Sequence, residues 1–187
     1  MPYEVGRRIA IYGNSGSGKS TLGRALGARL GIPYIELDEI MHYRPNWEDR
    51  TDEDFRAQVQ SRLDASPGGW ICDGNYGAAR DLILPRADTV IWLRLPFHVV
   101  YWRLASRTIG RSLRDAPLWN GNRESLRQTF FSKDSMLLWG LTSWRRSRRR
   151  TAEALASIPH GARVLVLRSP SEVRELLAEQ RESPRGG

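Results

Sequence analysis

One short segment constrains the fold of this chain more than any other part of the sequence. Residues 12–21 read YGNSGSGKST, and they lie between an apolar run, RIAIY, and a stretch with helical spacing, LGRALGARL. Gly13, Gly16 and Gly18 surround Lys19 in this segment. Small residues let a backbone curl so tightly that several N–H groups point at one place. The segment therefore predicts a strand, a tight anion-binding loop and a helix, in that order.

The spacing of the loop matches the P-loop pattern, in which backbone N–H groups cradle the phosphates of a nucleotide. Lys19 is expected to reach the β- and γ-phosphates, and the Ser20 hydroxyl is expected to serve Mg²⁺. The alternative is a glycine-rich turn with an incidental lysine, which the flanking strand and helix disfavour. We find no NKxD-type guanine-binding motif, so ATP is the favoured nucleotide. The predicted ATP cradle comprises Gly13, Asn14, Ser15, Gly16, Ser17, Gly18, Lys19, Ser20 and Thr21.

The rest of the chain alternates short apolar runs with segments of helical periodicity. Several runs lack polar alternation, as is typical of strands buried on both faces of a parallel sheet. This order predicts an α/β fold with helices packed on both faces of a parallel sheet. Thr51 and Ser169 are the expected N-caps of two helices, the second in a capping box with Glu172. The expected strands are 7–12, 33–37, 69–73, 88–94 and 162–167, and the expected helices are 19–30, 52–65, 97–109, 122–138, 142–157 and one that starts at Ser169.

The bulk composition is that of a globular protein. The 187 residues are 40% hydrophobic and 27% charged, which suits one domain with a proper core. Cys72 is the only cysteine, so no internal disulfide is possible. No apolar run is long enough to span a bilayer, and the first residues do not resemble a signal peptide. We expect a cytoplasmic protein with one domain over residues 1–182 and a frayed tail over 183–187.

Acidic residues follow two of the predicted strands, at the edge where parallel sheets bind their ligands. Asp73 ends the third strand and is the expected Mg²⁺ residue, directly or through water, although a turn aspartate is the alternative. Asp38 follows the second strand. It could orient or deprotonate an acceptor hydroxyl, belong to the outer shell of the metal, or cap a short helix. His42 could bind a substrate or cover the core.

The net charge of +8 comes from residues 97–150, since the segments on either side are close to neutral. Arg103, Arg107, Arg111 and Arg114 recur at spacings that place them on one face of a helix. We predict that this segment is a lid whose arginines stabilise charge on a transferring phosphoryl group. A solvated helix face is the alternative.

A second basic cluster, WRRSRRR at residues 144–150, has a different character. It could bind a nucleic acid, an acidic partner or nothing. Trp139 and Trp144 could stack on bases, but aromatic residues on helices more often belong to a core. A nucleic acid is therefore the less favoured partner, and a small-molecule or nucleotide phosphate acceptor is the favoured one.

Five segments together resemble the bacterial adenylate-kinase-like P-loop proteins known as DNA topology modulation (FlaR-type) proteins. They are GNSGSGKST, YIELDEIMHYRPNW, WICDGNY, ADTVIWLRLP and WNGNRES, in this order over roughly residues 8–140. The resemblance implies a nucleoside-kinase-like fold with strand order 2-3-1-4-5 and a lid. It also implies that Arg168, Ser169 and Pro170 pack on the adenine, and that Asn120, Asn122 and Arg123 line the acceptor pocket.

The sequence departs from true adenylate kinases after the third strand. They resemble one another there in an Asp-Gly-Phe-Pro-Arg segment, whereas this chain has Asp73-Gly74-Asn75-Tyr76-Gly77 and its next arginine is Arg80. AMP is therefore in doubt as the acceptor. Asp38 looks more like its counterpart in shikimate- or gluconate-type kinases. Two hypotheses remain: a Mg·ATP-dependent phosphotransferase, or an ATP-binding regulator that contacts DNA through residues 144–150.

Overall fold

The computed structural model describes residues 3–42, 49–114, 136–156 and 161–182, and the structural statements below refer to these. Their centre is a five-stranded sheet in the order β2-β3-β1-β4-β5. Every pairing between neighbouring strands is parallel. The predicted α/β fold and its strand order are confirmed.

The strands start and end within two residues of the predicted positions. They are β1 (Arg8–Gly13), β2 (Tyr34–Glu36), β3 (Trp70–Asp73), β4 (Thr89–Leu93) and β5 (Arg163–Leu167). The helices are α1 (Lys19–Leu30), α2 (Leu37–Met41), α3 (Asp52–Asp64), α4 (Arg80–Ile83), α5 (Phe97–Arg114), α7 (Met136–Ala156) and α8 (Pro170–Glu182). Single 3₁₀ turns, Gly77–Ala79 and Leu84–Arg86, flank α4.

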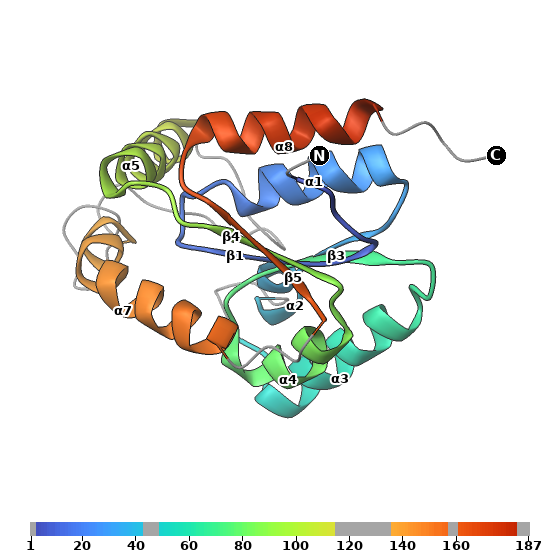
Figure 1. Ribbon diagram of the computed structural model, residues 1–187. Coiled ribbons are helices and arrows are strands. Elements are labelled where there is room, and N and C mark those ends of the chain that lie inside the picture. Colours follow the sequence, from blue (N-terminus) through green and yellow to red (C-terminus); the bar gives the residue numbers. More distant parts are fainter. Residues whose placement is uncertain (1–2, 43–48, 115–135, 157–160, 183–187) are drawn as a thin grey trace.

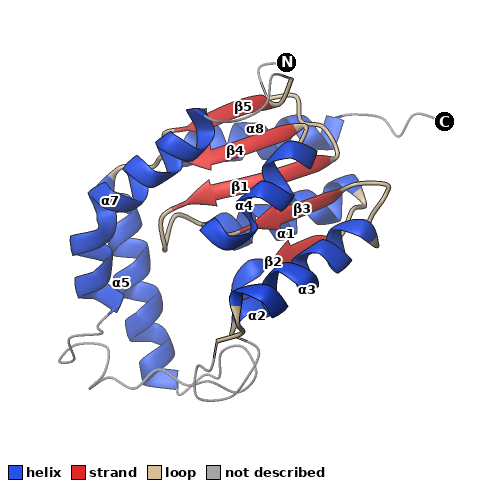
Figure 2. Ribbon diagram, turned by 90° about the horizontal axis from the view of Figure 1, so that it is seen from below, coloured by secondary structure: helices blue, strands red, loops and turns tan. Residues whose placement is uncertain are grey.

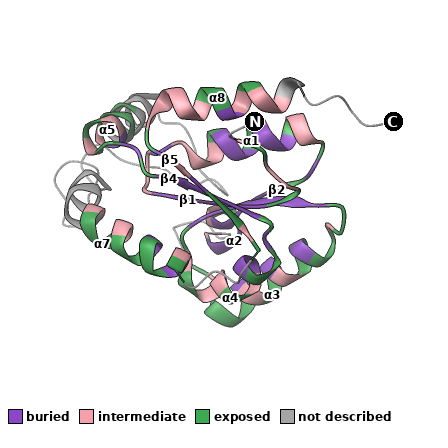
Figure 3. Cartoon of the chain, in the orientation of Figure 1, coloured by how far each residue is buried: buried purple, intermediate pink, exposed green. Residues whose placement is uncertain are grey.

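Helices cover both faces of the sheet. Figure 1 shows α1 and α8 on one face and α3, α4 and α7 on the other. In β1, Ile9 and Ile11 join the core beneath α1 and α8, whereas Ala10 and Tyr12 join the opposite core. Successive strand residues point to opposite faces, so burial of all four explains why this run lacks polar alternation. The central strands are accordingly buried along their length (Figure 3).

The parallel arrangement brings all strand ends of one kind to the same edge. Figure 2 shows the arrowheads of the sheet pointing in one direction, toward the side on which α5 lies. Gly13, Glu36 and Asp73 are the last residues of β1, β2 and β3. Residues far apart in the sequence are therefore neighbours at this edge.

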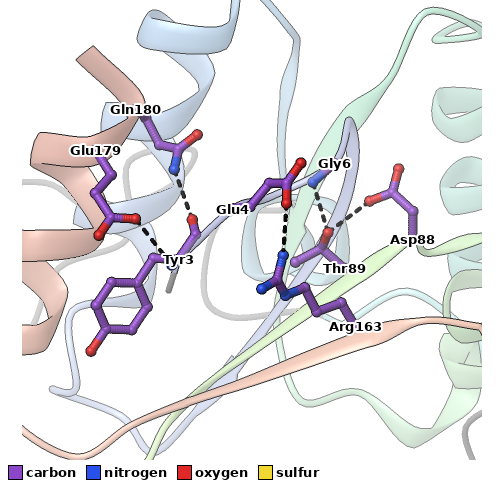
Figure 4. Close-up of polar contacts among 8 residues, drawn as sticks. All are labelled: Tyr3, Glu4, Gly6, Asp88, Thr89, Arg163, Glu179 and Gln180. Atoms are coloured by element: carbon purple, nitrogen blue, oxygen red, sulfur yellow. Dashed lines mark hydrogen bonds and ion pairs between the residues drawn. The ribbon is translucent and has the colours of Figure 1, made fainter. Parts of the chain in front are cut away.

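The N-terminal segment is tied down at the opposite edge of the sheet (Figure 4). Tyr3 N–H donates to Glu179 of α8 at 3.0 Å, and Gln180 donates to the Tyr3 carbonyl at 2.8 Å. Gly6 N–H donates to the Thr89 hydroxyl at 2.9 Å. An ion pair of 3.2 Å joins Glu4 to Arg163 at the start of β5. The segment before β1 thereby links α8, β4 and β5.

The helices differ from the prediction in three places. The helix expected at 97–109 continues to Arg114. The break expected between residues 138 and 142 is absent, because α7 is continuous from Met136 to Ala156 and a single helical glycine, Gly140, costs only about 1 kcal/mol. The start of the helix expected at 122–138 lies outside the described residues. A short helix opening at Asp38 was one of the alternatives, and α2 begins one residue earlier, whereas α4 was not predicted. No described helix is long and apolar enough to cross a membrane.

Candidate phosphate-binding active site

The predicted phosphate cradle is a loop from Gly13 to Gly18 that joins the central strand β1 to α1. Gly16 and Gly18 have φ values of 81° and 95°, a left-handed conformation that glycine adopts at little cost. Gly18 is the N-cap of α1 and supplies no side-chain hydrogen bond to the first turn. The first N–H groups of the helix, with its positive dipole end, can therefore serve an anion. Asn14 and Ser15 are half-buried in the same loop.

The Lys19 side chain folds back over the loop. Its Nζ donates to the Gly13 carbonyl at 3.0 Å and lies 3.5 Å from the Asn14 carbonyl. The Ser17 N–H also bonds the Asn14 carbonyl, at 3.0 Å, which closes the turn. Thr21 is exposed on α1. The lysine charge is thus held at the mouth of the loop, where the phosphates of a bound nucleotide would meet it.

Asn75, in the loop after β3, braces the start of the phosphate cradle. Its Nδ2 donates to the Gly13 carbonyl at 2.7 Å, and its Oδ1 accepts from the Gly13 N–H at 3.3 Å. A side-chain amide paired with both groups of one peptide residue fixes that residue in position. We missed this role in the sequence because Asn75 stood out only as a departure from the adenylate kinase segment. The sequence carries no local signal for this pairing, because 62 positions separate the two residues.

Asp73 reaches the site from the end of β3. The side chain is almost completely buried, and its Oδ2 accepts a hydrogen bond of 2.8 Å from the Tyr34 hydroxyl. The other oxygen, Oδ1, has no hydrogen-bond partner among the described residues. Burial raises the pKa of this carboxyl, and the positive charge of Lys19 acts in the opposite direction. A cation bound at Oδ1 would supply the missing partner of this oxygen and stabilise the charged form of the Asp73 carboxylate.

Glu36, at the end of β2, is a site residue that the sequence analysis missed. The sheet register places it beside Asp73, and only 6% of its surface is exposed. Its Oε1 accepts from the Ser20 hydroxyl at 3.3 Å, and its Oε2 pairs with Arg24 at 2.6 Å. Burial raises the pKa of Glu36, Arg24 opposes this, and Asp73 and Asp38 add to it. An acidic residue ending the strand before Asp38 was the available signal.

The residues present fit a magnesium ion that binds together with nucleotide phosphates. No group of three or more His, Cys, Asp or Glu side chains in the described chain could hold a metal alone. Mg²⁺ keeps water and phosphate ligands and takes few from the protein, so one carboxylate and one hydroxyl oxygen suffice for it. The partnerless Oδ1 of Asp73 and the Ser20 hydroxyl are the oxygen ligands that the protein would offer.

Asp38 lies in the first turn of α2, beside this cluster. It is not the helix cap, because the N-cap of α2 is Glu36, which makes no side-chain cap bond. Asp38 Oδ1 instead accepts a hydrogen bond of 2.7 Å from the Tyr76 hydroxyl. The Tyr76 oxygen also lies 3.3 Å from His42 Nε2. The cap interpretation is therefore wrong, and His42 takes part in a polar group rather than only covering the core.

Arg103 is the one predicted lid arginine whose side chain the structure describes. It lies on α5, and its Nη1 donates to the Ser17 carbonyl at 3.4 Å. A helix that follows β4 thus contacts the phosphate cradle. The role of this helix as a lid stays a prediction. Arg107 and Arg111 follow on the same helix, but their side chains lie outside the described part of the chain. The predicted acceptor-pocket residues Asn120, Asn122 and Arg123 lie outside the described residues altogether.

Arg168 follows β5 at the same edge and is exposed. Its N–H donates to Glu172 Oε2 at 2.8 Å, while the Glu172 N–H bonds the Ser169 hydroxyl at 3.2 Å. These bonds form the predicted cap of α8 and fix the turn that carries Arg168. Contact of this turn with an adenine stays a prediction.

The basic cluster at 144–150 occupies the middle of α7. The rings of Trp144 and Phe97 of α5 form a T-shaped pair with centroids 5.2 Å apart, and the Arg148 guanidinium lies over the Trp144 ring, 5.4 Å from its centroid. Trp144 is therefore part of the α5–α7 contact, which favours the core interpretation over base stacking. Four arginines of the cluster are exposed: Arg145, Arg146, Arg149 and Arg150.

The chain is similar in sequence to known kinases. The chain is 34% identical over 110 residues to an adenylate kinase isoenzyme 6 homologue of Caenorhabditis elegans, a match covering 53% of the chain and 58% of that protein. It is 30% identical over 125 residues to the shikimate kinase of Symbiobacterium thermophilum, covering 60% of the chain and 70% of that enzyme. The chain thus spans less than two thirds of the adenylate kinase homologue. No protein-family model matches the sequence.

A solved structure shows the same fold. The shikimate kinase of Acinetobacter baumannii in complex with shikimate superposes with a TM-score of 0.57 and 16% identity, over 95% of this chain and 91% of that one. Sheet order, loop and relatives together define a P-loop protein of the kinase type. The chain belongs to the P-loop kinase family that includes the shikimate kinases.

Proposed function

We propose that this protein is an ATP-dependent kinase that moves the γ-phosphate of Mg·ATP to a nucleotide or a small hydroxyl metabolite. One observation carries the proposal. The phosphate loop, the partnerless Oδ1 of buried Asp73 and the carboxylate of Asp38 meet at one edge of the sheet. A protein that only bound a nucleotide would have no need of the third group.

Each group has a distinct task in this proposal. The loop N–H groups and Lys19 bind the triphosphate, and Lys19 exchanges its bonds to the loop carbonyls for bonds to phosphate oxygens. Asp73 and the Ser20 hydroxyl hold Mg²⁺, which neutralises charge on the β- and γ-phosphates. Helix α5 brings Arg103 to the phosphates. Together with Arg107 and Arg111, Arg103 stabilises the charge on the transferring phosphoryl group.

Asp38 faces the acceptor side and binds or deprotonates the acceptor hydroxyl. A carboxylate suits a neutral hydroxyl better than an acceptor phosphate, which it would repel. A small hydroxyl compound, such as the substrate of the shikimate kinases, is therefore the first acceptor class to test. In this proposal residues 1–182 form one domain, residues 97–150 contain the lid, and the chain is a FlaR-type branch of the family.

Release of ADP from Mg·ATP across a panel of acceptors tests the proposal. The panel contains shikimate, gluconate, nucleosides, AMP, CMP, UMP and dTMP. We expect one acceptor to stimulate turnover, and we expect Lys19→Ala and Asp38→Asn each to abolish most of the stimulation. ATP binding without stimulation by any acceptor would contradict a kinase function.

The four exposed arginines of α7 favour one alternative, an ATP-binding regulator that contacts DNA through residues 144–150. Phosphate contacts make such binding strongly salt-dependent. Duplex affinity that is lost on neutralising Arg145, Arg146, Arg149 and Arg150 would support the regulator. Affinity that survives this change would remove the reason for proposing it.

A further inference from the structure

A chain of polar contacts leads from Asp38 to the surface of the protein. The Tyr76 hydroxyl is 2.7 Å from Asp38 Oδ1 and 3.3 Å from His42 Nε2. The other ring nitrogen of His42, Nδ1, is 2.6 Å from Asp49 Oδ1. The chain joins three separate parts of the fold: helix α2, the loop after β3 and the segment that leads into α3.

The direction of the hydrogen bonds follows from the number of protons available. Tyr76 has one hydroxyl proton, and the short contact to Asp38 shows that the carboxylate receives it, because a carboxylate can only accept. The Asp49 contact likewise requires a proton on Nδ1 of His42. Because the Tyr76 proton goes to Asp38, the contact between the Tyr76 oxygen and His42 Nε2 is a hydrogen bond only when Nε2 carries a proton as well and donates it. Burial, followed by the negative charge of Asp38, raises the pKa of Tyr76 far above its usual value, so the hydroxyl stays a donor.

The surroundings hold these groups in register. The Tyr76 ring packs against buried Phe55 of α3, with centroids 5.1 Å apart. Arg50, next to Asp49, bonds the Met41 carbonyl through its N–H at 3.0 Å and the Ile40 carbonyl through Nε at 2.9 Å. Tyr76 is therefore packed against the core, and the segment that carries Asp49 is fastened to α2 through Arg50.

The loop that carries Tyr76 is pressed tightly against α2. Gly74 has a φ of 144°, and a Cβ at that position would lie 2.8 Å from the Leu37 Cβ. Leu37 immediately precedes Asp38. Only a residue without a side chain lets the loop approach closely enough for Tyr76 to reach the carboxylate.

We infer that Tyr76 is a positioning residue for Asp38, and that His42 and Asp49 hold Tyr76 in place. Tyr76 occupies Oδ1, and in the proposed kinase the second oxygen, Oδ2, binds the acceptor. A carboxylate fixed by one oxygen binds an acceptor hydroxyl in one orientation, and misplacement by 1 Å can cost about a hundredfold in rate. The inference rests on the proposed kinase function.

The test is a double-mutant cycle on the acceptor-stimulated turnover of Mg·ATP. Tyr76→Phe keeps the ring against Phe55 and removes only the hydroxyl. We expect kcat to fall about tenfold to a hundredfold, with little change in the KM for ATP. In the Asp38→Asn background the same change should add almost nothing, because the residue acts through Asp38. Tyr3→Phe, at the far edge of the sheet, is the matched control and should leave kcat unchanged.

Two substitutions of His42 give an independent test, because one removes its hydrogen bond to Tyr76 and the other can restore it. His42→Ala should lower kcat, while His42→Gln, whose amide can still donate to the Tyr76 oxygen, should restore most of it. Two outcomes would overturn the inference while leaving the proposed function intact, provided that an acceptor stimulates the wild type. In the first, Tyr76→Phe has the same kcat as the wild type. In the second, the loss of kcat in Tyr76→Phe simply adds to the loss in Asp38→Asn. A wild type that no acceptor stimulates would overturn the proposed function and the inference together.

Discussion

The Gly13 carbonyl is the residue-scale feature on which the phosphate cradle depends. It accepts from Lys19 Nζ at 3.0 Å and from Asn75 Nδ2 at 2.7 Å. The lysine would leave this carbonyl to bind phosphate, whereas the asparagine would stay and keep the loop in shape. Asn75 therefore holds the cradle in the conformation that binds a nucleotide before the nucleotide arrives.

Replacing Asn75 should weaken nucleotide binding more than it weakens the fold. For Asn75→Ala we expect the affinity for Mg·ATP to fall about tenfold, which corresponds to about 1.4 kcal/mol. The hydrogen bonds lost should lower the free energy of unfolding by only about 1 kcal/mol. Calorimetric titration and urea unfolding measure the two quantities. Gln60→Ala, which removes an exposed amide bonded to Asp64, is the control. Unchanged ATP affinity in Asn75→Ala would contradict this role.

The sequence predicts local features of the site and misses those that depend on strand register. The loop residues from Gly13 to Ser20 could be found because their pattern is contiguous. Asn75 could not, because it joins the site only when β1 and β3 lie side by side. Glu36 had one local signal, its acidic side chain at the end of a strand, but its place beside Asp73 depends on the pairing of β2 with β3. The Tyr76 contact with Asp38 was hidden for the same reason, since 38 positions separate the two residues.

Among the helices, α3 packs against the loop that carries Tyr76, the residue that contacts Asp38. It begins at Thr51, whose Oγ1 accepts from the Asp54 N–H at 3.2 Å as predicted, and it carries Phe55 to the Tyr76 ring. Three acidic residues in its first turn also complement the helix dipole. The start of α3 was predictable because a cap is a local signal.

Loss of this cap should destabilise α3 by a predictable amount. Thr51→Ala removes the hydroxyl acceptor and should lower the free energy of unfolding by about 1 kcal/mol. Thr51→Ser keeps the hydroxyl and should restore most of that loss. Urea unfolding followed by circular dichroism measures both variants. Equal stability of the alanine and serine variants would mean that the cap does not hold α3.

The boundaries of α7 were harder to predict than those of α3. Its middle is rich in arginine, and the sequence predicts one helix ending at 138 and another starting at 142, where the structure has one continuous helix. Packing of Trp144 on Phe97 of α5 stabilises the helix across this region, and such tertiary support outweighs a weak local propensity.

At the scale of the whole molecule, three tyrosines that contact the core should make the fold sensitive to alkali. Burial raises the pKa of Tyr12 to about 12, and it also raises the pKa values of Tyr34 and Tyr76. In the unfolded chain these groups ionise near pH 10. A raised folded-state pKa contributes stability that is complete below the unfolded value and is lost as pH rises toward the folded value.

We therefore expect the free energy of unfolding to decrease steadily above about pH 10. Urea unfolding at a series of pH values measures this slope, and tyrosinate absorbance shows whether the buried hydroxyls ionise only on unfolding. Tyr12→Phe should have a shallower slope than the wild type. A stability that does not change between about pH 8 and pH 11 would contradict the burial of these hydroxyls.

The candidate site lies at one end of the strands, and the contacts that fasten the N-terminal segment lie at the other end. The phosphate loop, Asp73 and Asp38 occupy the carboxyl ends of the strands, while the tether of residues 3–6 occupies the opposite ends. The alternation of strands and helices in the sequence was enough to predict the first of these locations. It did not predict the tether, whose hydrogen bonds join residues far apart in the sequence. The predicted acceptor-pocket residues Asn120, Asn122 and Arg123 lie outside the described residues.

Transfer of the γ-phosphate is tested most directly by following the phosphorus of ATP with ³¹P NMR in the presence of Mg²⁺ and the stimulating acceptor. A kinase predicts that ADP appears together with a new phosphate ester or anhydride signal, in equal amounts, and that Lys19→Ala and Asp38→Asn suppress both. ADP that appears with inorganic phosphate alone, at a rate no acceptor changes, would contradict phosphoryl transfer and make the nucleotide a regulatory ligand.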